Sequence, residues 1–300
     1  MNAHYKIIIE EYGTWLATLG FCDKNVYSYK LLLRDFFEWL EHKKIDNINC
    51  LNNSHIKEYH NFLETRPNKF KKGRLLCEFS LYHNFTAINK LCEFLHQYGM
   101  VNAPVPVKLH IKIDKTERIN KIQVLTHNEI KTLFNSIENT YNYFNFEKRQ
   151  IRHYELKLIF ALYYGCGLRY TEGWNLQIKD VDFDKKTVFV RQGKNYKDRI
   201  VPMNENICNI IKDYVYNFRH KLKLNHNRLF TCGKSTIKDR LQELQKVCQD
   251  ENIKAKKVYL HLLRHSIATH LLQNGMSIEN ISLFLGHSSL DATQIYTHLI

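Results

Sequence analysis

Pro104 and Pro106 interrupt a helical pattern that runs through the first part of this 300-residue chain. Proline has no backbone N–H and clashes with the preceding helical turn, so a helix cannot continue through this pair. The stretch that follows, residues 106–122, alternates charged and aliphatic side chains without a helical period. We therefore expect two domains, residues 1–105 and residues 123–300, joined by a linker.

The first domain is expected to consist of helices. Apolar side chains recur in it at helical spacing, and Asn53 or Ser54 is expected to cap one helix. Gly99 is expected to end the last helix, because glycine readily adopts the left-handed conformation of a helix C-terminus. Between two of these helices lies a basic cluster that contains Lys69, Lys71, Lys72 and Arg74. Such a run is either a solvated face or a surface that contacts nucleic-acid phosphates.

The region after the linker combines helices with one small sheet. Thr126 and Glu129 have the spacing of a capping box, and a long helix is expected over residues 152–164. Residues 187–190 are β-branched or aromatic and residues 200–201 follow after a turn, which is typical of a hairpin. The expected fold class is mainly α, with a helical N-terminal domain and an α-rich second domain that carries a small antiparallel β-sheet.

The charge of the chain is strongly positive. A total of 44 Lys and Arg residues against 30 Asp and Glu residues gives a formal net charge of +14, and the excess concentrates after the linker. A surface this positive attracts polyanions, of which nucleic acid is the commonest. On charge alone, a basic protein without such a partner is the alternative.

Cysteine usage and hydropathy predict where the protein works. The 8 cysteines form no C-x-x-C pair, which argues against a zinc site or a disulfide framework and favours a reducing compartment. Glu10 and Glu11 directly follow the apolar residues 7–9, so this run is too short for a signal peptide. No uncharged run approaches the roughly 20 residues that span a bilayer. We expect a soluble, intracellular protein.

Residues 165–172 read G-C-G-L-R-Y-T-E, and the two glycines allow a sharp turn into a helix that Arg169 begins. An arginine there is unfavourable by itself, because a helix N-terminus already carries partial positive charge. An anion is therefore expected beside it, and a phosphate is one candidate. Glu172 lies on the same helix face, so an ordinary Arg–Glu surface pair is the alternative.

Residues 192–199 read Q-G-K-N-Y-K-D-R and form the turn between the two expected strands. Lys194 lies at the tip, where a flexible amine could reach into a cleft, and Lys197 and Arg199 follow it. Because many basic hairpin tips are only solvated, this segment is a weak signal when taken alone.

Residues 261–265 read H-L-L-R-H within an apolar helix. His261 and Arg264 share one face, and His265 lies one turn from His261. Two histidines at this spacing could bind a metal ion, but Arg264 would repel a cation. An imidazole beside a guanidinium suits a phosphate better, because Arg clamps the oxygens and His supplies a proton or hydrogen bond. A structural core histidine is the alternative for either His.

Residues 285–287 read L-G-H and precede Tyr296. Gly286 is expected to end one helix, and Ser288 or Ser289 is expected to cap the next. A phenol serves as a nucleophile only where fixed cations stabilise the phenolate and the transition state. One of 18 tyrosines therefore has meaning only if the cations of the other segments gather around it.

Together these segments resemble the tyrosine recombinase (phage integrase) family, and within it the Xer-like site-specific recombinases. The family pattern is an Arg in G-L-R-x-x-E, a Lys in G-K-x-x-K-x-R, an H-x-L-R-H helix, an L-G-H turn, and a Tyr nine residues after that His. All five features occur here in the same order. The resemblance is close over residues 125–300 and looser in the N-terminal helices.

The resemblance implies a role for each matching residue. Tyr296 would attack the scissile phosphate and form a 3′-phosphotyrosine bond, with release of a 5′-hydroxyl. Arg169 and Arg264 would hold the non-bridging oxygens. Glu172 would support the active-site Arg and His groups rather than react.

The remaining matching residues would move protons or bind phosphate. Lys194 would protonate the leaving 5′ oxygen, His261 would assist proton transfer at the nucleophile, and His287 would hydrogen-bond the phosphate. Lys197 and Arg199 are expected among the other DNA contacts. The resemblance implies no metal ion, no ATP and no other cofactor, because the protein–DNA bond retains the energy of the broken phosphodiester.

The implied partner is double-stranded DNA with a specific recombination site, bound by a homo-tetramer across two such sites. Accessory DNA-binding proteins are further candidate partners, no membrane partner is implied, and the implied location is the cytoplasm, in association with the nucleoid. Many relatives carry a further helix after the tyrosine that docks on a neighbouring subunit, whereas four residues follow Tyr296. Either this protein controls its assembly differently, or the chain is cut short.

Two other functions fit parts of the pattern. A type IB topoisomerase uses similar Arg, Lys, His and Tyr chemistry but relaxes supercoils as a monomer. The separate N-terminal helical domain and the H-x-L-R-H and L-G-H matches favour recombination instead. A DNA-binding regulator with a retired active site is the second alternative, and the presence of all six expected active-site residues argues against it.

Overall fold

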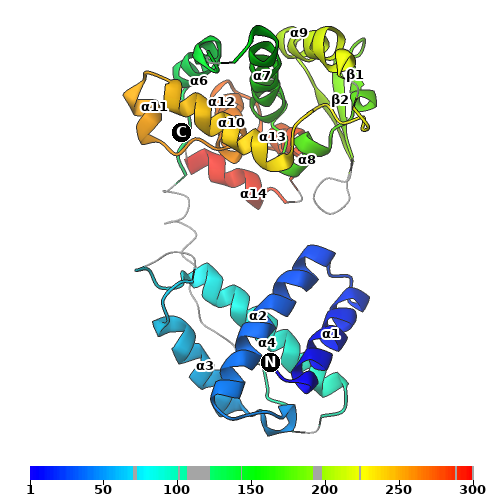
Figure 1. Cartoon of the computed structure of the whole chain (residues 1–300), viewed down its shortest axis with the longest axis vertical. Helices are drawn as coiled ribbons and strands as arrows, with labels where there is room; N and C mark the ends of the chain where they lie inside the picture. The colour runs from blue at the N-terminus through cyan, green and yellow to red at the C-terminus, as the bar shows by residue number, and fades with distance from the viewer. Residues whose placement is uncertain are drawn as a thin grey trace. The chain divides into compact units, whose positions relative to one another are not determined.

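The chain divides into two compact units, Met1–Asp114 and Lys115–Ile300, and each is described by itself. The computed structural model describes residues 1–69, 73–100, 102–106, 122–142, 144–191, 198–222, 224–287 and 289–298. Helices make up most of both units, and the second unit adds one small antiparallel sheet (Figure 1). The predicted fold class is confirmed.

The first unit is built from four α-helices and one short 3-10 turn within the described residues. These are α1 (Ala3–Thr18), α2 (Asp23–His42), η1 (Ile48–Cys50), α3 (Asn53–Thr65) and α4 (Glu78–Gln97). α1 runs antiparallel to α2 (Figure 1), since the Tyr5 ring stacks on Phe37 at 4.4 Å, whereas Glu10, further along α1, pairs with Lys30, which lies earlier in α2. Aromatic and aliphatic side chains share this core, and α2 contacts α3 through the rings of Phe36 and Tyr59, whose centroids are 4.8 Å apart.

The first unit contains two helix ends that the sequence predicted. α3 is capped by Asn52, whose side chain accepts hydrogen bonds from the backbone of Ser54 and His55, so the predicted cap at Asn53 or Ser54 is wrong. The reason is that a cap precedes the first helical residue, and three consecutive residues here could each have served. Gly99 lies directly after the C-cap of α4 with a φ of +85°, so the predicted end of that helix is confirmed.

The second unit alternates α-helices with short 3-10 and π-helical turns. Before its sheet lie α6 (His127–Asn135), η2 (Ser136–Asn139), α7 (Phe146–Ile159), η3 (Phe160–Gly165), α8 (Tyr170–Asn175) and η4 (Ile178–Asp180). After the sheet lie α9 (Glu205–Asp213), η6 (Tyr214–Phe218), η7 (Arg219–Lys221), α10 (Lys234–Val247), α11 (Glu251–Ala255), α12 (Leu260–Gln273), α13 (Ile278–Leu285), α14 (Asp291–Gln294) and η8 (Ile295–His298).

The sheet has the antiparallel order β1-β2-β3, with β1 at Val181–Asp182, β2 at Thr187–Val190 and β3 at Arg199–Pro202. Val188 on the central strand β2 pairs with Val181 of β1 on one side and with Val201 of β3 on the other. These valines turn inward to the core, which explains their β-branched character. The two predicted strands are confirmed, and β1 is an additional strand that the sequence did not predict.

The helix that precedes the glycine turn differs from its predicted form. α7 begins at Phe146 rather than at residue 152, and it changes at Phe160 into the π-helix η3, which ends at Gly165. π-helical turns widen a helix by one residue and often occur at functional sites. The predicted capping box at the start of α6 is confirmed, because Thr126 and Glu129 each accept a hydrogen bond from the other's backbone N–H.

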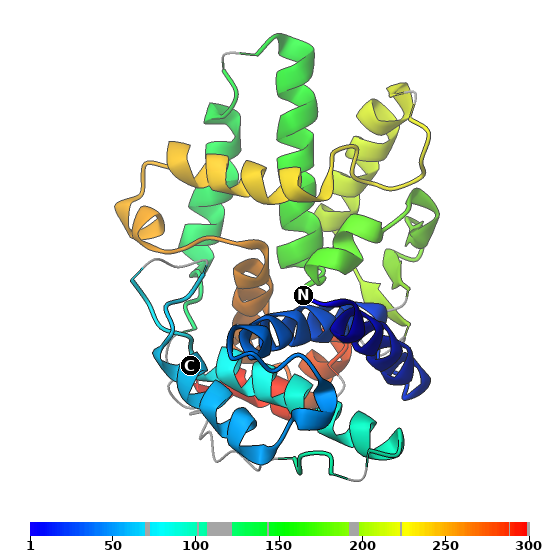
Figure 2. The same ribbon diagram turned by 60° about the horizontal axis from the view of Figure 1, so that its bottom comes forward.

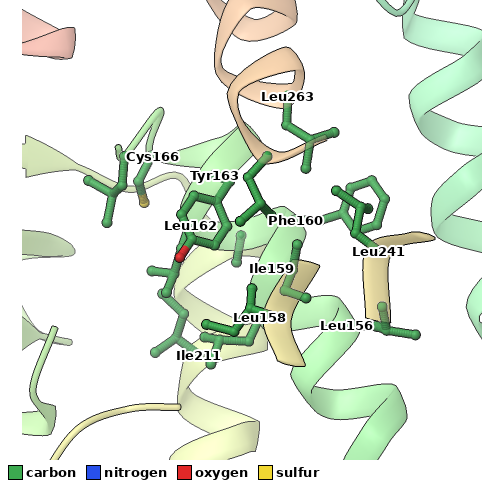
Figure 3. Packing of buried hydrophobic residues seen from close by; sticks show 14 of the residues in the cluster. Leu156, Leu158, Ile159, Phe160, Leu162, Tyr163, Cys166, Ile211, Leu241 and Leu263 are labelled. Atoms are coloured by element: carbon green, nitrogen blue, oxygen red, sulfur yellow. The ribbon is translucent and has the colours of Figure 1, made fainter. Parts of the chain in front are cut away.

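The core of the second unit is centred on η3. Figure 3 shows Phe160, Leu162 and Tyr163 among side chains from other helices. Ile211 belongs to α9, Leu241 to α10 and Leu263 to α12, and α10 crosses α7 (Figure 2). The close packing around η3 gives the segment that follows it, and therefore Arg169, a rigid base.

The last helices are joined by a glycine turn. Gly286 has a φ of +65° and closes α13, which confirms its predicted role. The predicted cap at Ser289 is wrong, because the N-cap of α14 is Leu290, which makes no side-chain cap bond. The alternative cap, Ser288, lies outside the described residues.

Candidate active site

Arg169 stands at the N-cap of α8, directly after the glycine turn. Gly167 has a φ of +58°, and a Cβ on it would lie 2.9 Å from Leu285 and Phe284, so only glycine fits this close approach. The turn delivers the Arg169 guanidinium to two acceptors. Its Nη1 donates to Glu172 Oε1 at 2.7 Å and its Nη2 donates to the Gly286 carbonyl at 2.6 Å. The Arg–Glu pair that was the alternative at this position is therefore present, and a phosphate beside this arginine remains a prediction.

Glu172 joins two arginines from different elements. Arg199 on β3 binds it in a bidentate manner, with Nη2–Oε2 at 2.8 Å and Nη1–Oε1 at 3.1 Å. The Arg169 backbone N–H also donates to Oε2 at 2.8 Å. Burial by itself would raise the pKa of Glu172, but hydrogen bonds and charge from Arg199, together with hydrogen bonds from Arg169, lower it to about 2. Glu172 is thus a permanent carboxylate that orients two guanidinium groups.

Arg264 is the most deeply buried arginine of the site, with 1% of its surface exposed. It extends from α12, and its two terminal nitrogens donate to the carbonyls of Gly167 and Leu285. Its Nε has no hydrogen-bond partner among the described residues. Burial and then the charge of Arg169 lower the pKa of Arg264 to about 9, so it remains charged at neutral pH. A fixed, incompletely paired cation of this kind is suited to an anionic ligand.

The turn at the end of α13 holds these cations together. The Leu285 carbonyl accepts from Arg264, and the Gly286 carbonyl accepts from Arg169. A Cβ on Gly286 would lie 2.8 Å from the Arg199 side chain. The L-G-H segment therefore acts through its backbone, and its glycine makes room for a guanidinium.

Tyr296 lies in η8 with 1% of its surface exposed. Its hydroxyl is 3.1 Å from Nδ1 of His265, the residue that follows Arg264 on α12. Burial raises the pKa of Tyr296 to about 12, against the opposing charges of Arg264 and Arg169. Burial and then the charges of His261 and Arg264 lower the pKa of His265 to about 3. Both partners are therefore neutral at neutral pH.

The other two histidines flank this pair. The His261 ring lies edge-on to His265 with centroids 4.4 Å apart, and the His287 ring lies parallel to Tyr296 with centroids 6.3 Å apart. His287 Nδ1 and the Thr293 hydroxyl are 2.7 Å apart. Part of the His261 ring is exposed, yet burial of the rest, followed by the charges of Arg264 and Arg169, lowers the pKa of His261 to about 4.

The structure brings most of the predicted site residues to one place in the second unit. These are Arg169, Glu172, His261, Arg264, His287 and Tyr296. Arg199 joins them through Glu172 rather than standing on an open surface, since its side chain is 10% exposed. Its prediction as a DNA contact remains a prediction. Lys194 and Lys197 lie outside the described residues.

The predicted basic cluster belongs to the first unit. Lys69 Nζ lies 3.0 Å from Asp35 on α2, with 57% of the side chain exposed, and Arg74 is exposed. Lys71 and Lys72 lie outside the described residues.

His265 is the site residue that sequence reasoning missed. The sequence placed it one turn from His261, and the interpretations offered for it were a metal-binding pair with His261 or a structural core histidine. Its contact with Tyr296 joins residues 31 positions apart, and no local pattern reveals such a contact.

Within the described ranges, no group of three or more His, Cys, Asp and Glu side chains is placed to hold a metal ion. None of the helices described is both long and apolar enough for a membrane crossing.

The chain is similar to known recombinases in sequence and in fold. Its residues 123–300 match the phage integrase family. It is 30% identical to the tyrosine recombinase XerA of Thermococcus kodakarensis, over 97% of this chain and 90% of that protein. It is 29% identical to a tyrosine recombinase of Thermosipho africanus, over 97% of this chain and 95% of that protein. The crystal structure of the XerH site-specific recombinase bound to difH substrate matches with a TM-score of 0.68 at 19% identity, over 91% of this chain and 76% of that chain.

The chain belongs to the phage integrase family. It is a site-specific tyrosine recombinase, an enzyme that cleaves and rejoins DNA. The family predicted from the motifs is confirmed. The predicted partner of the chain, DNA, is supported by these relatives as well. The alternatives of a type IB topoisomerase and of a retired regulator are not favoured by these relatives.

Proposed function

We propose that Tyr296 is the nucleophile of this recombinase. Its Oη attacks the scissile phosphorus and forms a 3′-phosphotyrosine bond, the bond from phosphorus to the 5′ oxygen breaks, and a 5′-hydroxyl leaves. The observation that carries this proposal is the convergence of Arg169, Arg264 and Tyr296, whose phenol lies within the field of both guanidiniums. Rejoining is the reverse step with a second 5′-hydroxyl, so no metal, ATP or other cofactor is needed.

Arg169 and Arg264 are proposed to clamp the two non-bridging oxygens of the phosphate. Support comes from their fixed orientation, since Glu172 and the carbonyls of residues 285–286 hold them in place before a substrate arrives. Preorganised cations stabilise a pentavalent transition state without reorganising during the reaction. Glu172 is proposed to act only through the arginines that it orients.

Proton transfer is proposed to involve three further residues. Lys194 protonates the leaving 5′ oxygen, and His287 donates a hydrogen bond to the phosphate. His261 assists proton transfer at the nucleophile, which its low pKa permits because the neutral ring can accept a proton.

We also propose a division of labour between the domains. Residues 1–105 form a helical core-DNA-binding domain, residues 106–122 a linker, and residues 123–300 the catalytic domain. Lys69, Lys71, Lys72 and Arg74 in the first domain, with Lys197 and Arg199 in the second, are proposed to contact DNA. Such phosphate contacts position the duplex and make binding salt-dependent.

The proposed assembly is a homo-tetramer across two recombination sites, with accessory DNA-binding proteins as possible partners. Strand exchange in the family joins two duplexes, which motivates this number of subunits. An enzyme that recombines chromosomal DNA works where that DNA lies, so we place it in the cytoplasm, in association with the nucleoid.

A covalent-trapping experiment tests the nucleophile. The protein is incubated with genomic DNA and denatured, and the DNA fragments that remain attached to it are sequenced. A nicked duplex of that sequence then serves as a suicide substrate. The wild-type protein and a Tyr216→Phe control, which changes an exposed tyrosine outside the site, should both form a denaturation-stable adduct. Tyr296→Phe should form none, and an adduct in that variant would contradict the proposal.

A further inference from the structure

The hydroxyl of Tyr296 is held by an imidazole that has no assigned role. His265 Nδ1 lies 3.1 Å from Tyr296 Oη, and the two residues are 8% and 1% exposed. They come from α12 and η8, which pack directly against each other. This contact therefore links the nucleophile to the helix that carries Arg264.

The surroundings of the pair are apolar on one side and cationic on the other. Tyr296 packs with Ala268, Ile281 and Leu285 in a small cluster of buried side chains. Among the residues that the structure describes, the titratable and charged groups that face the pair are His261 and Arg264 on α12, Arg169 at the start of α8, and His287 beyond α13. Water has little access to such a site, so a hydrogen bond inside it is not exchanged for one with solvent.

The protonation states decide how the hydrogen bond runs. Burial and the neighbouring cations lower the pKa of His265 to about 3, and burial raises the pKa of Tyr296 to about 12. The bond therefore joins two neutral groups at neutral pH. A phenol is a stronger acid than a neutral imidazole, so the Tyr296 O–H donates and Nδ1 of His265 accepts.

We propose that His265 is a positioning residue for the nucleophile, which holds the Tyr296 phenol protonated in a withdrawn position that must open before attack. This inference rests on the proposed role of Tyr296. A hydroxyl on a side chain with 1% exposure cannot meet a phosphate of a DNA duplex, so the tyrosine has to be uncovered. The hydrogen bond to His265 resists that movement.

The same geometry argues against His265 as the general base. The hydrogen bond between Nδ1 and Oη belongs to the buried position of Tyr296, so it breaks when the phenol moves out to meet a phosphate, and His265 then no longer contacts the reacting oxygen. The structure thus separates His265, which contacts Oη, from His261, for which no hydrogen bond to Tyr296 occurs among the described residues. Removing one neutral hydrogen bond should ease opening by about three- to tenfold.

Two substitutions separate holding from catalysis. In His265→Asn, the amide oxygen occupies nearly the place of Nδ1 and accepts the hydrogen bond but cannot act as a base. In His265→Leu, the acceptor is lost at similar volume. With a nicked suicide duplex at saturation, single-turnover adduct formation should be about three- to tenfold faster in His265→Leu and within about twofold of wild type in His265→Asn. An unchanged or slower rate in His265→Leu, or a loss of about 100-fold or more in His265→Asn, would overturn the proposal.

A second measurement needs no DNA and no activity. The protein is labelled with 3-fluorotyrosine at every tyrosine. The fluorine resonance that is missing from the Tyr296→Phe variant is the resonance of residue 296. That resonance should report a buried ring in the wild type and in His265→Asn, and should move toward the solvent-exposed position in His265→Leu. A resonance that is already exposed in the wild type, or that His265→Leu leaves unmoved, would contradict the proposal. If the wild type forms no DNA adduct at all, the role of Tyr296 fails while this measurement still tests the hydrogen bond.

Discussion

The interiors of the two units differ in the charge that they bury. Among the described residues of the first unit, the buried side chains are aliphatic or aromatic apart from Asn84 and the thiol of Cys92. The second unit buries a set of ionisable groups that includes Glu155, Glu172, Arg240, Arg264, His265 and His270. Taking an ion out of water costs several kcal/mol unless partners compensate for the lost hydration. The second unit buries ionisable side chains of Glu, Arg and His at several positions, whereas the first unit buries none of these among the residues that the structure describes.

The buried charges of the second unit fall into two groups, and only one belongs to the site. Glu155 pairs with Arg240 between α7 and α10 and accepts a hydrogen bond from Thr231, which ties helices together away from Tyr296. Arg169, which Glu172 holds in place, and Arg264 instead converge on the turn at residues 285–286. Under the proposed function, the first unit would contact DNA only through its surface, whereas the second unit holds its candidate catalytic groups in a preorganised interior.

The largest expected effect is on the apolar side of this comparison. Phe36 is fully buried, and its ring lies 4.8 Å from that of Tyr59. Phe36→Ala should lower the free energy of unfolding of the first unit by about 3–5 kcal/mol, because it removes apolar contacts and leaves a cavity. Denaturant unfolding followed by tryptophan fluorescence measures this loss, with Phe36→Leu as the milder control. A change below about 1 kcal/mol would show that this core is not closely packed.

Arg264→Ala tests the charged interior. Cleavage should fall by about 10²–10³ because one of the fixed charges around the transition state is lost. Duplex binding should stay within about tenfold of wild type, since many other phosphate contacts remain. Adduct formation on a suicide duplex and a binding titration measure the two quantities. Arg264→Lys is the matched control and should also cleave slowly, because an ammonium cannot reach both carbonyls that the guanidinium bridges. Cleavage near the wild-type rate would refute the clamp.

Acid unfolding isolates the contribution of Glu172. Its pKa is lowered from an ordinary value of 4.5 to about 2 in the folded chain, so its stabilisation is fully present above pH 4.5. As the pH falls from 4.5 toward 2, that stabilisation, on the order of 3 kcal/mol, should be lost. Glu172→Gln should lack this part of the pH dependence and be less stable at pH 7. Parallel stability–pH curves for the two proteins would contradict the ion-pair geometry.

The smallest expected effect is at the surface of the first unit. Replacing Lys69 and Arg74 by Gln should weaken DNA binding and reduce the slope of log affinity against log salt by up to about 2, at roughly 0.9 for each phosphate contact. Lys57→Gln, an exposed lysine on α3, serves as the control for a general loss of charge. An identical slope in the double variant and the control would remove this cluster from the DNA interface.

Local sequence signals predicted local structure well in this chain. The capping box at Thr126, the glycine ends at Gly99 and Gly286, and the strand at Thr187–Val190 are each specified by neighbouring residues. Arg169 was placed correctly at the start of a helix, and its need for an anion followed from the helix dipole.

Contacts between distant segments were beyond the sequence. The pairing of Glu172 with Arg199 and the hydrogen bond from Tyr296 to His265 depend on how helices and sheet pack, which no residue spacing encodes. The π-helical turn Phe160–Gly165 was also missed, because one extra residue per turn hardly alters the pattern of a run whose residues are nearly all apolar. The motifs that resemble a family supplied the members of the site, and the fold supplied their partners.

The most direct test of this account is to locate the covalent bond between protein and DNA. The wild-type adduct on a suicide duplex is digested with protease and nuclease, and the modified peptide is sequenced by mass spectrometry. A single modified peptide is expected, with the 3′-phosphate of the cleaved strand on Tyr296. A nucleotide attached to any other residue would contradict it.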